Sequence, residues 1–194
     1  MSLIIGLTGP TGSGKTTVSK AAESLGFKII DCDKIARKAV EKGEEGLKSI
    51  VAAFGEEILL KDGELDRKAL ALAAFSSKEK TELLNKTLLP YIVEKVKAEV
   101  EGEYILLDAP TLFESGLNSI CQATIAVLCD ENIRKVRIIN RDGLSEREAD
   151  LRMNAGKKDE FYLEKTENII YNRGTEQELY DAAMKTFKKL LGGN

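Results

Sequence analysis

The chain has 194 residues, of which 43% are hydrophobic and 31% charged, and it contains no histidine. The missing histidine excludes a Ser–His–Asp or Cys–His nucleophile pair, a histidine general base and a histidine-liganded zinc. Its 29 Lys and Arg residues against 32 Asp and Glu residues leave a net charge of −3, which excludes a chain-wide electrostatic footprint for nucleic acid or an acidic membrane.

The cysteines and the first apolar run indicate a cytoplasmic protein. Cys32, Cys121 and Cys129 are odd in number and show no C-x-x-C spacing, which suits a reducing compartment. The run Leu3–Leu7 is too short for a signal peptide or a membrane span. We therefore expect no membrane partner, no nucleic acid, and a monomer or a small homo-oligomer.

Short apolar runs alternate with helical patterns along most of the chain. This alternation is typical of crossover units, so the sequence predicts an α/β three-layer domain with a five-stranded parallel sheet and ligands at the carboxyl ends of its strands. The predicted strands are Leu3–Thr8, Lys28–Cys32, Tyr104–Asp108, Thr124–Cys129 and Asn168–Tyr171.

The alternation breaks between residues 33 and 102, where no strand is indicated. Leu47, Ile50, Val51 and Phe54 recur at helical spacing, and later segments also read as helical. Pro90 is expected to stop or kink the chain. This insertion is either ordinary helical packing or the wall of a substrate pocket.

Capping patterns punctuate the predicted helices. Ser76, Ser145 and Thr175 each precede a Glu by three residues, as in a capping box that opens a helix. Gly26 follows the first predicted helix, where a glycine commonly ends one.

Residues 9–16, the phosphate loop, match G-x-x-x-x-G-K-[ST] at every specified position. The loop follows a predicted strand and opens a helix, as such loops require. Its backbone N–H groups would cradle phosphate, Lys15 would reach the β- and γ-phosphates, and the Thr16 hydroxyl would bind Mg²⁺. The pattern therefore predicts a nucleoside triphosphate site.

The other motifs favour a small kinase among the phosphate-loop proteins. Asp108-Ala109-Pro110-Thr111 is not the D-x-x-G of a GTPase, and Asn85-Lys86-Thr87-Leu88 is not its N-K-x-D. A mechanochemical ATPase usually needs a longer chain. One nucleotide domain, a helical insertion for the acceptor and a basic lid fit a kinase.

Two carboxylate groups stand at predicted strand ends. Asp31 and Asp33 would share one side of the second strand, where one could accept the proton of an attacking hydroxyl and the other touch metal or water. The alternative is that Asp33 caps the next helix. Asp108 is either a Mg²⁺-associated carboxylate or an ordinary turn residue.

Arginines are concentrated late in the chain. Arg134, Arg137 and Arg141 would share one face of a helix. A lid that carries arginine would stabilise the transferring phosphoryl group and exclude water. A solvated charged face explains most of them, so we expect one or two to be catalytic.

The sequence resembles the dephospho-CoA kinase family over nearly its whole length. The likeness is carried by the phosphate loop, by Asp31-Cys32-Asp33, and by Asp62-Gly63-x-Leu65-Asp66-Arg67 in the insertion. It continues through Leu112-Phe113-Glu114 and Arg141-Asp142-Gly143-Leu144-Ser145, and Asn172 closes it. The phosphate loop occurs in many protein families, so the segments on the acceptor side are the part of the resemblance that is specific to this family.

The resemblance implies a P-loop kinase that transfers phosphate from ATP to the ribose 3′-hydroxyl of dephospho-CoA, with Mg²⁺. It implies one domain over 1–194, made of a core (1–32, 103–134 and 166–194), a helical insertion that binds CoA (33–102) and a lid (135–165). Asp33, Lys15 and Arg141 would be catalytic, and Thr16 and Asp108 would hold the metal. The ATP-binding residues would be Gly9, Thr11, Gly12, Ser13, Gly14, Lys15, Thr16 and Thr17.

Three positions depart from the family pattern. Leu89 stands where the family usually has His, Thr111 where it has Leu, and Gly156 near its usual Gln. They bear on the choice of acceptor and leave the phosphate chemistry untouched. The alternatives are a kinase for another nucleoside, nucleotide or small hydroxylated metabolite, and an ATP-binding regulatory module without turnover.

Overall fold

A parallel sheet forms the centre of the first part of the molecule. The computed structural model describes residues 2–192, and among them five strands pair in the order β2-β3-β1-β4-β5. The predicted α/β fold with a five-stranded parallel sheet is confirmed. The strands are β1 (Leu3–Thr8), β2 (Lys28–Asp31), β3 (Tyr104–Asp108), β4 (Ala123–Leu128) and β5 (Asn168–Tyr171).

Strand β1 is the central strand, and its register aligns the carboxyl ends of its neighbours. Leu7 pairs with Asp108 of β3, and Thr8 pairs with Ala126 of β4. The residues that follow β1, β3 and β4 therefore lie at one edge of the sheet. Ligands of open α/β sheets bind at this edge, so the sheet topology places the phosphate loop where a ligand is expected.

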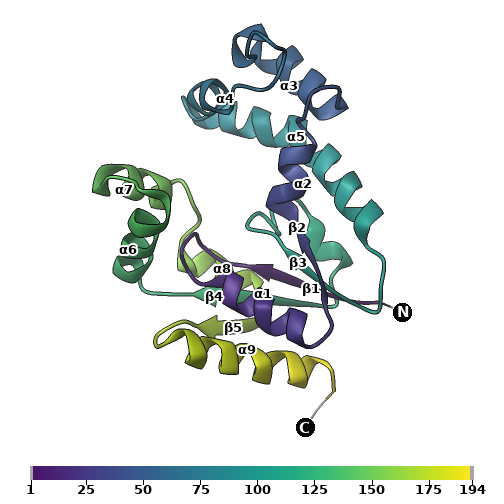
Figure 1. The fold of residues 1–194 in the computed structure, drawn as a ribbon, viewed down its shortest axis with the longest axis vertical. Helices are drawn as coiled ribbons and strands as arrows, with labels where there is room; N and C mark the ends of the chain where they lie inside the picture. The colour runs from purple at the N-terminus through teal and green to yellow at the C-terminus, as the bar shows by residue number, and fades with distance from the viewer. Residues whose placement is uncertain (1, 193–194) are drawn as a thin grey trace. The chain divides into compact units, whose positions relative to one another are not determined.

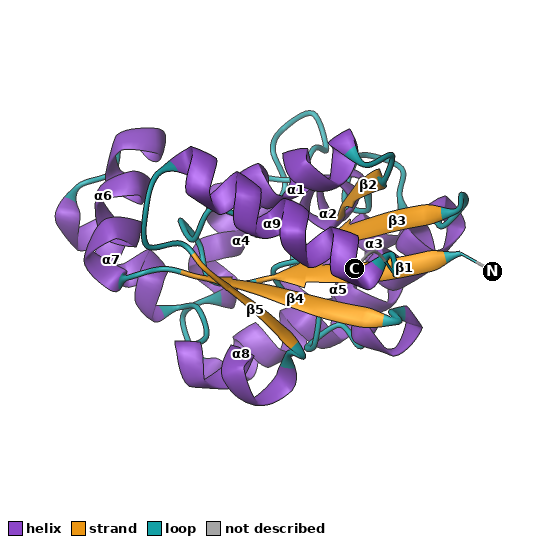
Figure 2. Ribbon diagram, turned by 90° about the horizontal axis from the view of Figure 1, so that it is seen from below, coloured by secondary structure: helices purple, strands orange, loops and turns teal. Residues whose placement is uncertain are grey.

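Helices connect the strands and cover both faces of the sheet. Figure 2 shows α1 and α9 on one face and α8 on the other. The described helices are α1 (Lys15–Ser24), α2 (Cys32–Lys38), α3 (Glu45–Phe54), α4 (Arg67–Ala74), α5 (Lys78–Glu99), α6 (Glu131–Asp142), α7 (Glu146–Asn154), α8 (Asp159–Lys165) and α9 (Glu176–Leu190), with short 3₁₀ helices η1 (Glu56–Ile58) and η2 (Leu117–Ile120).

The main apolar core lies between the sheet and the α1–α9 pair. Strand residues are buried on both faces, as parallel strands covered by helices require. The rings of Phe27 and Phe187 meet at 5.3 Å between centroids at one end of this core. The core residues are Ile5, Leu7, Val18, Ala21, Ala22, Phe27, Leu106, Ile125, Val127, Ile170, Leu179, Ala183 and Phe187.

The chain divides into two compact units, 1–30 with 101–194 and 31–100. The second unit contains α2 to α5, with α3 and α4 packed on α5 (Figure 1), and it covers nearly the same residues as the insertion expected over 33–102. It has its own apolar core, made of Val40, Leu47, Ile50, Ile58, Leu70 and Ala74. The boundaries of a separate lid over 135–165 stay a prediction.

Several local predictions differ from the structure. Strand β2 ends at Asp31, because the Asp31 side chain accepts the Lys34 N–H at 2.9 Å and opens α2. Ser77, and not Ser76, caps α5. Helix α5 also continues through Pro90, so of the expected stop or kink the stop is wrong, and the kink stays a prediction. The capping boxes at Ser145 and Thr175 are confirmed.

No helix in the described residues is long and apolar enough to cross a membrane.

Candidate active site

The phosphate loop leaves β1 in a conformation that only glycine adopts easily. Gly9 has φ +135°, and a Cβ at this position would overlap the carbonyl oxygen of Val127 on β4. Gly14, with φ +107°, is the N-cap of α1. The loop therefore lies directly against the neighbouring strand and delivers the chain into the helix at Lys15.

The Lys15 side chain folds back and hydrogen-bonds to the backbone at the start of the phosphate loop. Its Nζ donates to the carbonyl oxygens of Gly9 at 2.8 Å and Pro10 at 3.3 Å. This places an ammonium group within the loop that is expected to surround phosphate. Thr16 lies exposed in the first turn of α1, while Thr11 is half-buried in the loop.

Ser13 of the phosphate loop and Thr17 of α1 are the remaining predicted ATP-binding residues with polar side chains. Ser13 is fully buried, and its Oγ has no hydrogen-bond partner among the described residues. The Thr17 hydroxyl donates to Glu176 of α9 at 3.3 Å. The predicted ATP-binding residues are thus continuous in space, although their side chains face in different directions.

Asp108 stands at the carboxyl end of β3, beside the phosphate-loop strand. The Ser19 hydroxyl of α1 donates to Asp108 Oδ2 at 3.1 Å, which orients the carboxylate. Together with the exposed Thr16 hydroxyl, this supplies oxygen donors of the kind that Mg²⁺ prefers. No cluster of three or more His, Cys, Asp or Glu residues able to hold a metal occurs among residues 2–192.

The start of α6 packs against the phosphate loop. Arg137 Nη1 donates to the Gly12 carbonyl at 3.3 Å, and the same nitrogen lies 3.5 Å from Cys129 Sγ. A Cβ on Gly12 would lie 3.0 Å from the carbonyl oxygen of Arg134. Helix α6 therefore touches the loop through both backbone and side chain.

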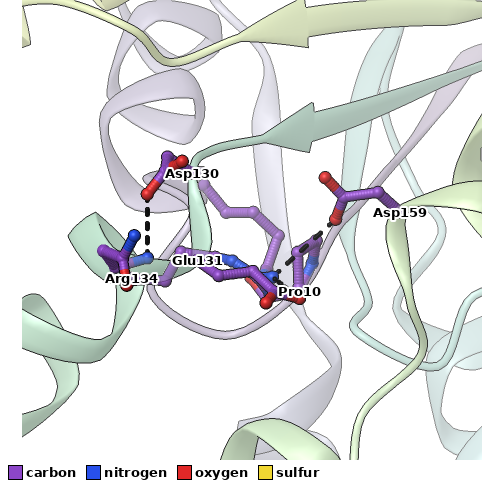
Figure 3. Close-up of polar contacts among 7 residues, drawn as sticks. Pro10, Asp130, Glu131, Arg134 and Asp159 are labelled. Carbon is purple, nitrogen blue, oxygen red and sulfur yellow. Dashed lines mark hydrogen bonds and ion pairs between the residues drawn. The ribbon is translucent and has the colours of Figure 1, made fainter.

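Arg134 is buried beside this contact. Its side chain has Glu131 and Asp159 as carboxylate partners at 3.4 and 3.9 Å (Figure 3). Burial raises the pKa of Asp159, and the charge of Arg134 opposes that rise. These contacts indicate that Arg134 joins α6 to α8 within the fold.

Arg141 is the predicted lid arginine, and it lies near the far end of α6. Seven residues of helix separate it from Arg134, or about 10 Å along the axis. Its Nε and Nη2 bind Asp142 at 2.8 and 2.9 Å, and Arg152 also binds Asp142 at 2.7 Å. The hydrogen bond from Arg141 holds the pKa of Asp142 below its usual range. Within the described chain, no contact joins Arg141 to the phosphate loop.

Asp33 lies in the second unit, in the first turn of α2, and its side chain is exposed. Asp31 is the N-cap of that helix, so the predicted arrangement of both carboxylates along one side of a strand is wrong. Asp33 also lines a pocket of about 380 Å³ that is formed within residues 31–100. The other lining residues are Ala36, Arg37, Val40, Leu65, Arg67, Leu70, Ala71, Phe75, Leu84 and Leu88.

One hydrogen bond joins two arginines that line this pocket. Arg67 Nη2 donates to the carbonyl oxygen of Arg37 at 3.3 Å, which links the α2 and α4 walls. Leu88 lines the pocket, whereas its neighbour Leu89 is not among the lining residues. The pocket thus combines one carboxylate and two guanidinium groups with an apolar wall.

Three polar contacts at the loop were not anticipated from the residues. Ser19 holds Asp108, Arg137 holds Gly12, and the Asn172 side chain donates to the Ser13 carbonyl at 2.8 Å. Each joins segments that are far apart in the sequence. The one available signal was position, since Asn172 directly follows a strand at the ligand-binding edge of the sheet.

Comparison with known proteins gives a consistent result. A family model for dephospho-CoA kinase matches residues 3–178. A dephospho-CoA kinase of Geobacillus kaustophilus is 39% identical over 184 residues, which are 92% of each chain. One of Arabidopsis thaliana is 37% identical over 194 residues, covering 97% of this chain and 82% of the relative.

Solved structures agree with the sequence relatives. A crystal structure from Thermus thermophilus is 30% identical, covers 99% of both chains and has a TM-score of 0.82. A dephospho-CoA kinase from Campylobacter jejuni is 26% identical over 97% of each chain, with a TM-score of 0.61. A shikimate kinase of Acinetobacter baumannii, 16% identical with a TM-score of 0.59, shares the fold.

Proposed function

The chain belongs to the dephospho-CoA kinase family, and we infer from this membership that it transfers the γ-phosphoryl group of ATP to the ribose 3′-hydroxyl of dephospho-CoA. The products are ADP and coenzyme A, so the reaction is the last step of coenzyme A biosynthesis. The observation that carries the choice of acceptor is the pocket of the second unit, because it places the exposed Asp33 beside two arginines and an apolar wall.

This pocket has the chemistry that dephospho-CoA requires. The acceptor carries a pyrophosphate, which guanidinium groups such as those of Arg37 and Arg67 bind well. It also carries an adenine ring and a pantetheine arm, which can cover apolar side chains such as Leu70 and Leu88. The ribose hydroxyl needs a carboxylate close by, and Asp33 lines the same pocket.

The phosphate loop would bind ATP through its β- and γ-phosphates. Lys15 already directs its ammonium group to the carbonyl oxygens of Gly9 and Pro10 at the loop entrance. A phosphate in the loop would compete for that ammonium group and place it against the oxygens on which negative charge develops. The backbone N–H groups and the start of α1 would add their partial positive charges.

Thr16 and Asp108 are the residues that would hold Mg²⁺. Both offer oxygen atoms, and Asp108 is oriented by the Ser19 hydroxyl at 3.1 Å. Few protein ligands are needed, since Mg²⁺ in kinases is bound by one or two side chains together with the substrate phosphates. When bound, the ion supplies charge neutralisation between the β- and γ-phosphates.

Asp33 would accept the proton of the ribose 3′-hydroxyl while the hydroxyl oxygen forms a bond to the γ-phosphorus of ATP. The bond between that phosphorus and the β,γ-bridging oxygen breaks, and ADP leaves with the electron pair. Arg141 would contribute from the lid, because a cation near the transferring group stabilises its charge. Its ion pair with Asp142 would have to rearrange for that contact.

The test is a coupled ADP-release assay in which dephospho-CoA is compared with adenosine, AMP and pantetheine phosphates. We expect ADP formation that depends on both Mg²⁺ and dephospho-CoA. Equal turnover with AMP or adenosine would indicate a kinase for another acceptor. ADP release that no acceptor stimulates would contradict the proposal.

A further inference from the structure

The side chain of Asn172 lies against the phosphate loop from outside it. Asn172 directly follows β5, and its backbone N–H donates to Leu128 at 2.7 Å, which continues the β4–β5 pairing. Its side chain is 4% exposed. Nδ2 donates to the carbonyl oxygen of Ser13 at 2.8 Å, across 159 residues of sequence. A short, buried bond therefore joins the end of a strand to the middle of the loop.

This bond determines the orientation of one peptide unit of the loop. A trans peptide is planar, so its carbonyl and its N–H point in opposite directions. When Asn172 holds the Ser13 carbonyl, the N–H of Gly14 in the same unit is directed away from Asn172. That N–H is one of the donors that such a loop presents to phosphate.

The contact leaves little room for rearrangement. A Cβ on Gly14 would lie 2.5 Å from Asn172 Nδ2 and 2.8 Å from a methyl group of Leu179. The Asn172 amide thus packs directly on the Gly14 backbone, with α9 behind it. The preceding carbonyl, of Gly12, is held from α6 by Arg137, so side chains from two other elements hold successive loop carbonyls.

The Asn172 amide has only one of its two polar atoms satisfied within the described residues. Asn172 Oδ1 is buried and has no hydrogen-bond partner among the described residues. A buried acceptor without a partner costs free energy, which offsets part of what the bond from Nδ2 to the Ser13 carbonyl contributes to the fold. The bond that the amide does make is the one to the loop.

We propose that Asn172 is a positioning residue for the phosphates of the nucleotide, which it serves by holding the Ser13–Gly14 peptide in its phosphate-binding orientation. The inference rests on the proposed function only for the identity of the nucleotide. It concerns affinity for the donor, and it leaves the acceptor pocket of the second unit unaffected.

The chain offers a matched control at the other end of β5. Asn168, at the opposite end of β5, donates through Nδ2 to the Thr124 carbonyl at 3.1 Å, far from the loop in sequence and at the other edge of the sheet. Asn172→Leu and Asn168→Leu each remove one bond from a side-chain amide to a backbone carbonyl, at opposite ends of β5. We expect Asn172→Leu to weaken ADP binding by about tenfold in titration calorimetry and to raise the KM for ATP by a similar factor. In Asn172→Leu the KM for dephospho-CoA stays within twofold of that of the unaltered chain. Asn168→Leu changes neither the affinity for ADP nor the KM for ATP.

Asn172→Asp provides a second variant of nearly unchanged shape, with Asn168→Asp as its control. It removes the donor and sets a carboxylate against the Ser13 carbonyl, so we expect a larger loss of ADP affinity than in Asn172→Leu. This variant carries the test if Asn172→Leu does not fold, as judged by thermal unfolding.

Two results would overturn the proposal. One is a folded Asn172 variant that binds ADP as tightly as the unaltered chain. The other is an equal loss in the Asn168 controls, or an equal rise in both KM values, because a general structural role would then explain the effect. ADP calorimetry needs no acceptor, so a failure of dephospho-CoA as substrate would contradict the proposed function without affecting this comparison.

Discussion

Replacing Gly9 with alanine is expected to destabilise the protein strongly, although it adds only one carbon atom. The new Cβ would overlap the carbonyl oxygen of Val127 and lie 3.1 Å from the Val127 nitrogen. Both atoms belong to the backbone of β4, which is paired with β1 and β5. Neither can move aside without disturbing the centre of the sheet.

The magnitude has two parts. Alanine at φ +135° has a backbone conformation that costs about 1–3 kcal/mol, and overpacking against rigid neighbours costs about 1–3 kcal/mol more. Alanine also restricts the unfolded chain, which returns about 0.4–1 kcal/mol. We therefore expect the free energy of unfolding to fall by about 1–5.5 kcal/mol, which for a chain of this size lowers Tm by about 2–22 °C.

Gly26→Ala is the matched control for this measurement. Gly26 also has a positive φ, +86°, but a Cβ there would meet nothing within 4 Å. The Gly26→Ala variant should show only the cost of the backbone conformation. Its free energy of unfolding should fall by about 1 kcal/mol and its Tm by about 2–4 °C. Thermal and urea unfolding of both variants separate the two parts. A Tm loss in Gly9→Ala no larger than in Gly26→Ala would refute the steric reasoning.

Three further predictions concern catalysis and pH. Asp33→Asn should lower kcat by about 10²-fold or more while ATP still binds, because only proton acceptance is removed; a fall in ATP affinity alone would indicate a metal or structural role. Asp108→Asn should raise the Mg²⁺ concentration for half-maximal activity by about tenfold or more without unfolding the chain, since the amide oxygen can still accept the Ser19 hydroxyl; an unchanged Mg²⁺ dependence would contradict it. Hydrogen bonds from the Thr175 backbone and side chain lower the pKa of Glu178 from 4.5, so this group stabilises the fold above about pH 4.5 and the stability is lost as pH falls through the lowered pKa. Glu178→Gln should therefore flatten part of the Tm decrease on acidification below pH 4.5, and an unaltered pH profile would argue against this capping charge.

The strands were the part of the fold that sequence reasoning located best. The bounds of β1, β3 and β5 agree with the prediction, because short apolar runs between turn residues have few other places to begin or end. Errors arose where two local signals competed. Asp31 could continue a strand or cap a helix, and adjacent Ser76 and Ser77 could each open α5.

Pro90 shows how tertiary packing overrides a local preference. Proline disfavours a helix interior, yet α5 continues through it. Ile92 and Val96, beyond the proline, are buried in this helix, and α3 and α4 pack on α5. Burial of apolar side chains across the second unit offsets the lost hydrogen bond, which a window of neighbouring residues does not indicate.

The residues of the candidate site likewise fall into those that a local sequence pattern indicated and those whose contacts depend on tertiary packing. The phosphate loop was predictable because its chemistry lies in eight consecutive residues. The role of Asp33 stays a prediction, and its expected alignment with Asp31 along a strand was wrong because α2 begins there. The contacts of Ser19 with Asp108, Arg137 with Gly12 and Asn172 with Ser13 join positions 89 to 159 residues apart. Side-chain hydrogen bonds of this kind depend on packing distances that no local pattern encodes.

The sequence by itself determined the fold class and the nucleotide loop, because both rest on the periodicity or spacing of nearby residues. It also indicated the family, through a resemblance that runs over nearly the whole chain. Tertiary structure decided which groups hold that loop and which residues of the second unit form the pocket around Asp33. The physical reason is range: propensity and motif spacing act over a few residues, whereas the direction of a buried amide or guanidinium group is set by the elements that close around it.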